Sequence, residues 1–315
     1  MDPQYFRLSR RPFRLAPDTQ LFCSTPTHDA ALKALTMALR HGGLALLEGE
    51  AGSGKSLIGL KLFESAPAST LRLFLQASPG MRATEFFQAI LFDLGLPYQG
   101  LTEHELRLAI HGALLDALGD GRSVALLIDE AHQLMPDAFD ELRLFGNLES
   151  QSSPPIGIVL LAALGFRSRL SPLHRIALQQ RLATAVQLAP LSVEESRDYI
   201  VEQLRNCGGR ADRPMTGEAI ALLAEQGRGT PRVLNRAAAL AFQIAESAGV
   251  REVDAEAVLE ALEQLELFDP NRIPDGPAIL PMNGTVLPRL AEAPSAATAG
   301  EPARATAKKP KRKSA

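Results

Sequence analysis

Residues 49–56 read Gly49-Glu50-Ala51-Gly52-Ser53-Gly54-Lys55-Ser56 and give the strongest indication of how this 315-residue chain folds. Their spacing matches G-x-x-x-x-G-K-[ST], a phosphate-binding loop whose glycines let backbone amides surround an anion. An apolar stretch over 43–50 predicts a strand before the loop, and a leucine-rich stretch over 55–64 predicts a helix after it. This order suits the chemistry, because the positive end of the helix then faces the bound phosphate.

The loop predicts a site for ATP and Mg²⁺. Lys55 is expected to reach the β- and γ-phosphates, and the Ser56 hydroxyl is expected to bind the metal ion. The residues expected to surround the nucleotide are Gly49, Glu50, Ala51, Gly52, Ser53, Gly54, Lys55, Ser56 and Leu57.

A pair of acidic residues ends the apolar stretch over 123–129. A strand buried on both faces would carry these side chains to its carboxyl end, where parallel sheets bind ligands. Asp129 is expected to hold Mg²⁺, directly or through water. Glu130 is expected to act as the general base that polarises the attacking water.

Strands and helices alternate along the chain up to about residue 190. Besides the stretches already named, strands are predicted over 71–77, 156–166 and 184–190. Helices are predicted over 84–95, 103–121 and 136–150, with Thr84 as the N-cap of the first and Gly95 just after its end. The expected fold class is therefore α/β, with a parallel sheet flanked by helices and right-handed crossovers.

After Pro190 the predicted strands stop and four helices follow, over 192–208, 216–227, 231–249 and 254–266. Ser192 and Glu195 have the spacing of a capping box at the first of them. From Leu265 onward, proline-rich sequence without helical periodicity predicts a disordered tail. The tail ends in KKPKRK, which serves either as a solvated end or as an electrostatic tether to an anionic membrane or nucleic acid.

Composition and charge exclude several classes of protein. The chain is 46% hydrophobic and 22% charged, has no apolar run long enough to span a bilayer, and its first residues lack the apolar core of a signal peptide. Cys23 and Cys207 have no metal-ligand spacing and form no disulfide framework. The tail is net positive and the rest of the chain net negative, which is not typical of a general nucleic-acid binder. We expect a cytoplasmic protein.

Three further stretches carry a resemblance to a known family. They are YFRLSRRPFRLAPD with a following histidine and AL pair (5–32), LLIDEAHQL (126–134) before DELRLFGNLES, and LSVEES (191–196) before RGTPRVLNRA. Together they resemble the ExeA/GspA-type AAA+ ATPases, which are related to MshM and more distantly to transposition helper ATPases. The resemblance implies four regions: an N-terminal segment packed on the core (1–25), an AAA+ α/β nucleotide-binding domain (26–190), a helical lid (191–267) and the disordered tail (268–315).

The resemblance also implies roles for side chains outside the loop. Arg232 matches the sensor 2 position, from which it would reach the γ-phosphate and report the nucleotide state to the lid. Arg181 matches an arginine finger that acts in trans on a neighbouring subunit, with Arg175 as a competitor for that role. His28 stands where the family has a histidine before its first helix, and either an adenine contact or a polar surface position is open.

One departure from the family concerns sensor 1, the polar residue that positions the attacking water. The family usually reads Gly-Gln-Pro-Glu-Leu there, whereas residues 162–166 of this chain read Ala-Ala-Leu-Gly-Phe. Asn147 is a candidate substitute. Hydrolysis is therefore expected to be slow, or the chain acts mainly as a nucleotide-gated switch. His132 stands where the family usually has glutamine, and no other helicase motif accompanies the DEAH sequence.

The expected function is that of a Mg²⁺-dependent ATPase that forms a homo-oligomer and assembles or remodels a partner complex. The resemblance implies an envelope, pilus, secretion or exopolysaccharide export system, with peripheral contact to the inner membrane left open. Two alternatives remain. One is a DNA-associated ATPase resembling transposition helpers, and the other is an ATP-binding switch or scaffold with little hydrolysis.

Overall fold

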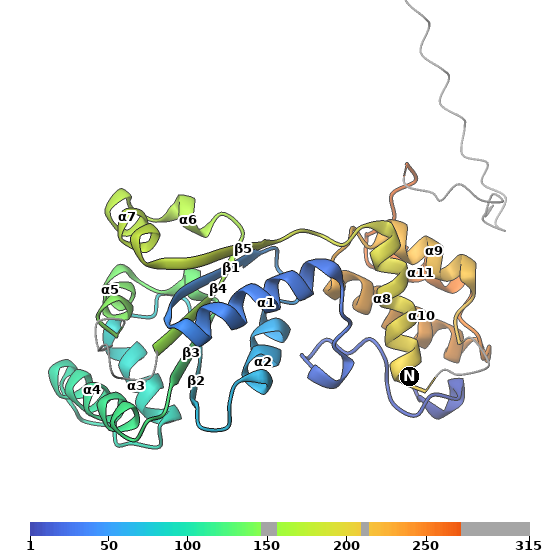
Figure 1. The fold of residues 1–315 in the computed structure, drawn as a ribbon. Helices are drawn as coiled ribbons and strands as arrows, with labels where there is room; N and C mark the ends of the chain where they lie inside the picture. Colours follow the sequence, from blue (N-terminus) through green and yellow to red (C-terminus); the bar gives the residue numbers. More distant parts are fainter. Residues whose placement is uncertain (146–155, 209–213, 272–315) are drawn as a thin grey trace, which may run out of the picture. The chain divides into compact units, whose positions relative to one another are not determined.

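A parallel β-sheet forms the centre of the fold. The computed structural model describes residues 1–145, 156–208 and 214–271, and within them five strands form one sheet in the order β2-β3-β4-β1-β5 (Figure 1). The strands are β1 (Gly43–Gly49), β2 (Leu71–Gln76), β3 (Val124–Asp129), β4 (Ile156–Ala163) and β5 (Leu182–Leu188). Every pairing is parallel, so all five carboxyl ends lie at the same edge. The expected α/β fold class is confirmed.

Helices cover both faces of this sheet. They are α1 (Pro26–His41), α2 (Lys55–Ser65), α3 (Ala83–Asp93), α4 (Glu103–Gly119), α5 (Pro136–Phe145), α6 (Phe166–Arg169) and α7 (Pro172–Arg181). Alternate residues of β1 enter different cores. Leu46 packs with apolar residues of α3, α4 and α5, whereas Leu47 packs with those of α1 and α2. This alternation follows from the two-residue period of a strand.

A helical region follows the sheet and has its own core. It contains α8 (Val193–Asn206), α9 (Gly217–Gln226), α10 (Pro231–Ser247) and α11 (Ala255–Gln264). The capping box predicted at Ser192 and Glu195 is confirmed, because the Ser192 hydroxyl accepts from Glu195 N and the Glu195 carboxylate accepts from Ser192 N.

The N-terminal segment, residues 1–23, joins the core of the helical region. This segment includes two short 3₁₀ helices, η1 (Gln4–Phe6) and η2 (Thr19–Leu21). Its buried side chains in that core are Phe6, Leu8, Phe13 and Leu21. The Phe6 ring meets the edge of Phe242 in α10 at 4.8 Å between ring centroids. Both cysteines are buried free thiols. Cys23 is the last residue of this segment, and Cys207 directly follows α8.

Several predicted boundaries are wrong by a few residues for identifiable reasons. Thr84 is not the N-cap, because the Glu85 carboxylate accepts the Arg82 N–H at 2.8 Å and α3 begins at Ala83. β4 ends at Ala163 rather than 166, since Gly165 has a φ of 75° and turns the chain into α6. The end of the helix predicted over 136–150 and the tail from 272 lie outside the described residues. Within the described ranges, no helix is long and apolar enough to cross a membrane.

Candidate nucleotide-binding site

The loop over 49–56 connects β1 to α2, in the strand–loop–helix context that its sequence predicts. Gly52 and Gly54 have φ values of 84° and 97°, a region that residues with side chains rarely adopt. A Cβ atom at Gly49 would lie 2.7 Å from Ser53 Oγ, and one at Gly52 would lie 2.5 Å from Arg232 Cβ. These three glycines are therefore required by the geometry of the loop.

The ammonium group of Lys55 is held inside this loop. Its side chain is 6% exposed, and Nζ donates to the carbonyl oxygens of Gly49 at 3.0 Å and Glu50 at 2.8 Å. Burial is the main cause that lowers the Lys55 pKa, while the Glu130 and Asp129 carboxylates oppose that shift. A phosphate at the loop would thus meet a cation that is already oriented by the backbone.

Ser56 and Asp129 meet at the carboxyl end of the sheet. The Ser56 hydroxyl donates to Asp129 Oδ2 at 2.5 Å, and the Asp129 side chain is 3% exposed in the last position of β3. A hydroxyl and a carboxylate are hard oxygen donors of the kind that Mg²⁺ binds together with substrate phosphates. The donor set therefore fits the predicted ion.

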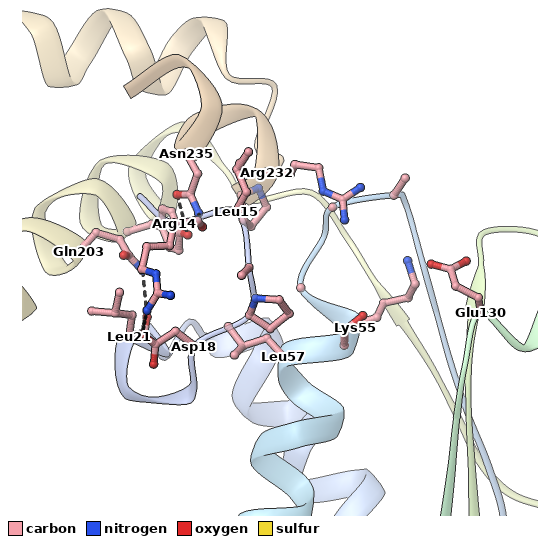
Figure 2. Close-up of a pocket in the computed structure, with 18 residues that line it drawn as sticks. Arg14, Leu15, Asp18, Leu21, Lys55, Leu57, Glu130, Gln203, Arg232 and Asn235 are labelled. Atoms are coloured by element: carbon pink, nitrogen blue, oxygen red, sulfur yellow. Dashed lines mark hydrogen bonds and ion pairs between the residues drawn. The ribbon is translucent and has the colours of Figure 1, made fainter. Parts of the chain in front are cut away.

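Glu130 follows Asp129 in a sharp turn. Its φ of 54° is uncommon for a residue with a side chain, and its N–H donates to Asp129 Oδ1 at 2.8 Å. Figure 2 shows the Glu130 carboxylate directed toward the Lys55 ammonium group, with both residues in the wall of one pocket. A carboxylate at this position can accept a proton from a water molecule held near the phosphates.

The opposite wall of the pocket comes from residues 14–18 and Leu21 of the N-terminal segment and from α8 and α10. Asn235 Nδ2 donates to Arg14 O at 3.0 Å, and Gln203 Nε2 donates to Leu21 O at 2.8 Å (Figure 2). The sequence did not mark Arg14, Leu21, Gln203 or Asn235 as site residues. No local pattern indicates their role, because each pair joins residues far apart in the chain.

Arg232 connects the helical region to the phosphate loop. It is the second residue of α10, and its backbone N–H donates to Gly52 O at 3.2 Å. Its side chain lines the pocket with Lys55 and Glu130, and Figure 2 shows it extending from α10 over the loop. The structure thus brings Arg232 to the same pocket as the loop and Glu130.

His28 lies behind the loop rather than in the pocket wall. It is 7% exposed, its Nε2 is 3.0 Å from Ser53 O, and its Nδ1 is 2.6 Å from Thr25 Oγ1. A polar surface position is therefore wrong. His28 is also not among the residues that line the pocket, so its contact is with the loop backbone.

The two candidate arginine fingers lie away from this pocket. Arg181 is the last residue of α7 and is half-buried, and Arg175 is exposed on the same helix. Neither lines the pocket of its own chain, so a role for either in trans remains a prediction. Asn147, the candidate substitute for sensor 1, lies outside the described residues.

His132 is the neighbour of Glu130 that the sequence did not mark as important. It belongs to the short helix η3 (Ala131–Gln133) and is 15% exposed. Its Nδ1 lies 3.4 Å from Glu130 Oε2 and accepts the backbone N–H of Ala163, the last residue of β4, at 3.3 Å.

Comparison with known proteins gives one matching family and several similar structures. Residues 38–170 match the family described as AAA domain. Over 240 residues the chain is 30% identical to "General secretion pathway protein A" from Aeromonas hydrophila, which covers 75% of this chain and 43% of that protein. The chain therefore spans less than half the length of this relative.

Several solved structures resemble the fold of this chain. CDC6P from Pyrobaculum aerophilum has a TM-score of 0.64 and 18% identity over 84% of this chain and 71% of that chain. Aeropyrum pernix ORC1, solved in complex with DNA, has a TM-score of 0.63 and 21% identity over 80% of this chain and 68% of that chain. The RuvB branch migration motor of Thermotoga maritima has a TM-score of 0.51 and 19% identity over 80% and 73%. At these identities the likeness concerns the fold alone.

Proposed function

Because this chain contains an AAA domain and is related in sequence to general secretion pathway protein A, we propose that it binds Mg²⁺-ATP and hydrolyses it to move its helical region. One observation carries the proposal: the loop lysine, the acidic end of β3 and an arginine of α10 all line, or directly adjoin, one pocket. Each of the three comes from a different part of the chain. Their convergence is what a nucleotide-driven movement of the helical region requires.

The proposed reaction assigns one task to each side chain. The loop amides and Lys55 hold the phosphate chain, and Ser56 and Asp129 hold Mg²⁺, which neutralises charge on the phosphates. Glu130 accepts a proton from the attacking water. The water oxygen then bonds to the γ-phosphorus, the bond from that phosphorus to the bridging oxygen breaks, and ADP and phosphate are released.

Arg232 is proposed as the residue that reports the state of the γ-phosphate. Its position supports this role, because the backbone N–H of Arg232 donates to Gly52 O and Arg232 also lines the pocket. Loss of the γ-phosphate removes an anion from beside the guanidinium, so the balance of contacts between α10 and the loop changes. Arg181, or Arg175 in its place, is proposed to reach the γ-phosphate of a neighbouring subunit.

The proposed partner is an envelope complex of the secretion, pilus or exopolysaccharide export type. The chain is proposed to act on it as a homo-oligomer in the cytoplasm, with or without peripheral contact to the inner membrane. The name of the Aeromonas relative supports this proposal, and that relative extends well beyond the matched part. The helical region, rather than the sheet, is then the part that transmits movement to the partner.

A second candidate is an ATP-binding switch with little hydrolysis. It is favoured by the end of β4, where Ala162, Ala163 and Leu164 offer no side chain that could hold a water molecule. A DNA-associated ATPase is favoured only by the basic sequence of the tail. Deletion of 304–315 would then abolish a salt-dependent affinity for DNA.

The deciding experiment is the steady-state ATPase rate with Mg²⁺ against protein concentration. Wild type is compared with Lys55→Ala, Glu130→Gln and Arg181→Ala, and with Lys61→Ala as a matched control on the exposed side of α2. A rate that rises cooperatively and is lost in the first three variants supports the proposal. If wild type turns over no faster than Glu130→Gln while both bind ATP, hydrolysis is not its activity and the switch replaces it.

A further inference from the structure

The end of β4 meets the beginning of the phosphate loop without contributing a polar side chain. Ala163 is the parallel neighbour of Gly49, and the backbone N–H of Leu164 donates to Gly49 O at 3.1 Å. The side chains of Ala162, Ala163 and Leu164 have no hydrogen-bonding atoms. A polar side chain that positions a reacting group near the end of β4 must therefore come from another element.

The imidazole of His132 lies between this edge and the candidate base. Its Nδ1 accepts the Ala163 N–H at 3.3 Å, and the same Nδ1 lies 3.4 Å from Glu130 Oε2. The histidine is 15% exposed, whereas Glu130 is 41% exposed and lines the pocket. One ring nitrogen of His132 thus lies within reach of both the backbone of β4 and the carboxylate that lines the nucleotide pocket.

The backbone of the turn maintains this contact. Glu130 has the left-handed φ of 54°, and the N–H of Gln133 donates to Glu130 O at 2.8 Å, which closes η3 over the turn. A strained residue of this kind persists only when its surroundings over-determine it, and such residues cluster at functional sites. The turn therefore sets both the direction of the Glu130 side chain and the place of the ring beside it.

We propose that His132 is the positioning residue for Glu130, an inference that rests on the hydrolysis proposed above. A neutral imidazole nitrogen either accepts a hydrogen bond or donates one, but not both. When Nδ1 accepts from Ala163, the ring proton is on Nε2 and the ring is held by the backbone of β4. In the other tautomer Nδ1–H donates to Glu130 Oε2 and orients the carboxylate, while Nε2 can accept from the side-chain amide of Gln133, whose Nε2 lies 3.2 Å away. The ring thereby links the end of β4 to the candidate base without any change of net charge.

The first test separates turnover from binding. His132→Ala should lower kcat about 10–100-fold, the usual cost of losing an outer hydrogen-bond partner at a site. KM and the Kd for ATP should stay within about 2-fold of wild type, because His132 does not line the pocket. His132→Asn keeps a polar atom near the position of Nδ1 and should retain most of the rate. His132→Gln places its polar atoms near Nε2 and should resemble His132→Ala. His104→Ala, at an exposed histidine of α4, is the control.

The second test is a double-mutant cycle with Glu130→Gln. If His132 acts through Glu130, His132→Ala should change the residual rate of Glu130→Gln less than about 2-fold. A residue that merely supports the fold would lower the rate in both backgrounds. An unchanged kcat in His132→Ala, or full additivity in the cycle, overturns the proposal.

A third measurement does not depend on hydrolysis, so that the two proposals can fail separately. The chain has six histidines, and the ring nitrogens of His132 can be assigned by ¹⁵N-histidine labelling and their loss in His132→Asn. Glu130→Ala should shift the Nδ1 resonance of His132 and leave His104 unchanged. If wild type fails to hydrolyse ATP but this shift occurs, only the proposed function is lost. If the resonance does not move, the positioning contact is refuted.

Discussion

The buried carboxylate of Glu48 forms an ion pair with Arg167, with 2.7 Å between Glu48 Oε2 and Arg167 Nε, and also accepts the Arg167 backbone N–H at 3.3 Å. Glu48 lies in β1 directly before the phosphate loop and is 2% exposed, whereas Arg167 belongs to α6 and is 41% exposed. The pair therefore ties the start of the loop to the α6–α7 segment, which carries the proposed arginine fingers.

Removal of the cation should be costly because it leaves a buried charge without its partner. Arg167→Ala is expected to lower the free energy of unfolding by about 1–3 kcal/mol, less than for a fully enclosed pair because Arg167 is partly solvated. Urea denaturation measures this. Arg169→Ala, two residues along and exposed, should cost under about 0.5 kcal/mol, and equal losses in the two variants would contradict the assignment.

Contact between the loop and α10 can be tested at Gly52. Gly52→Ala should both strain the backbone and push Arg232 away, because its Cβ would lie 2.5 Å from Arg232 Cβ. We expect a loss of stability of about 1–3 kcal/mol and an ATP affinity at least about 10-fold weaker. Gly80→Ala is the matched control, since Gly80 has a similar φ of 76° but no atom within 4 Å of the added Cβ. Its affinity for ATP should be unchanged in isothermal titration calorimetry.

Burial of the Cys23 thiol, at the end of the N-terminal segment, should lower the free energy of unfolding at high pH. Burial raises the pKa of the Cys23 thiol from 9.0 to about 12, so between these values the unfolded chain loses a proton that the folded chain keeps. Stability then falls as pH rises above about 9, by about 1 kcal/mol between pH 8 and pH 10. Urea titrations of wild type and Cys23→Ala measure the difference. If both curves have the same slope, the burial assigned to Cys23 is wrong.

Action of Arg181 across subunits can be tested by mixing two inactive variants. Arg181→Ala keeps an intact pocket, and Glu130→Gln keeps an intact finger, so mixed oligomers contain some complete sites. The mixture should regain a measurable fraction of the wild-type rate, whereas each variant alone should lose about 10³-fold or more. Arg175→Ala mixed in the same way identifies which arginine acts. An Arg181→Ala enzyme with a normal rate would remove this residue from the proposal.

Much of the site was predictable because its signals are local. The loop and the acidic pair each occupy a few consecutive residues next to a buried strand, and the parallel sheet then brings Ser56 and Asp129 into contact across the chain. The N-terminal wall was not predictable in this way. Its hydrogen bonds join Arg14 to Asn235 and Leu21 to Gln203, and no periodicity in either stretch encodes such distant pairs.

The predicted start of the helix at Thr84 was wrong because a different hydrogen bond fixes the start of α3. Thr84 has the chemistry of a cap, but its hydroxyl donates to Glu103 in the next helix at 2.9 Å. The Glu85 carboxylate instead accepts from Arg82 N, so the N-cap lies two residues earlier. The contact of His132 with β4 was not predictable for a similar reason, because only the folded chain brings Ala163 to its ring.

The helical core is built from both ends of the described chain, with the sheet inserted between them. Phe6, Leu8 and Phe13 leave the ribosome before the strands of the sheet, yet the helices that bury them, α8 to α11, are synthesised after those strands. During translation these apolar side chains stay exposed while the α/β part is made. Exposed apolar side chains make incomplete chains prone to aggregation. Any truncated product that stops before Leu191 would keep them exposed, and chaperone capture or degradation is the expected fate of such a fragment.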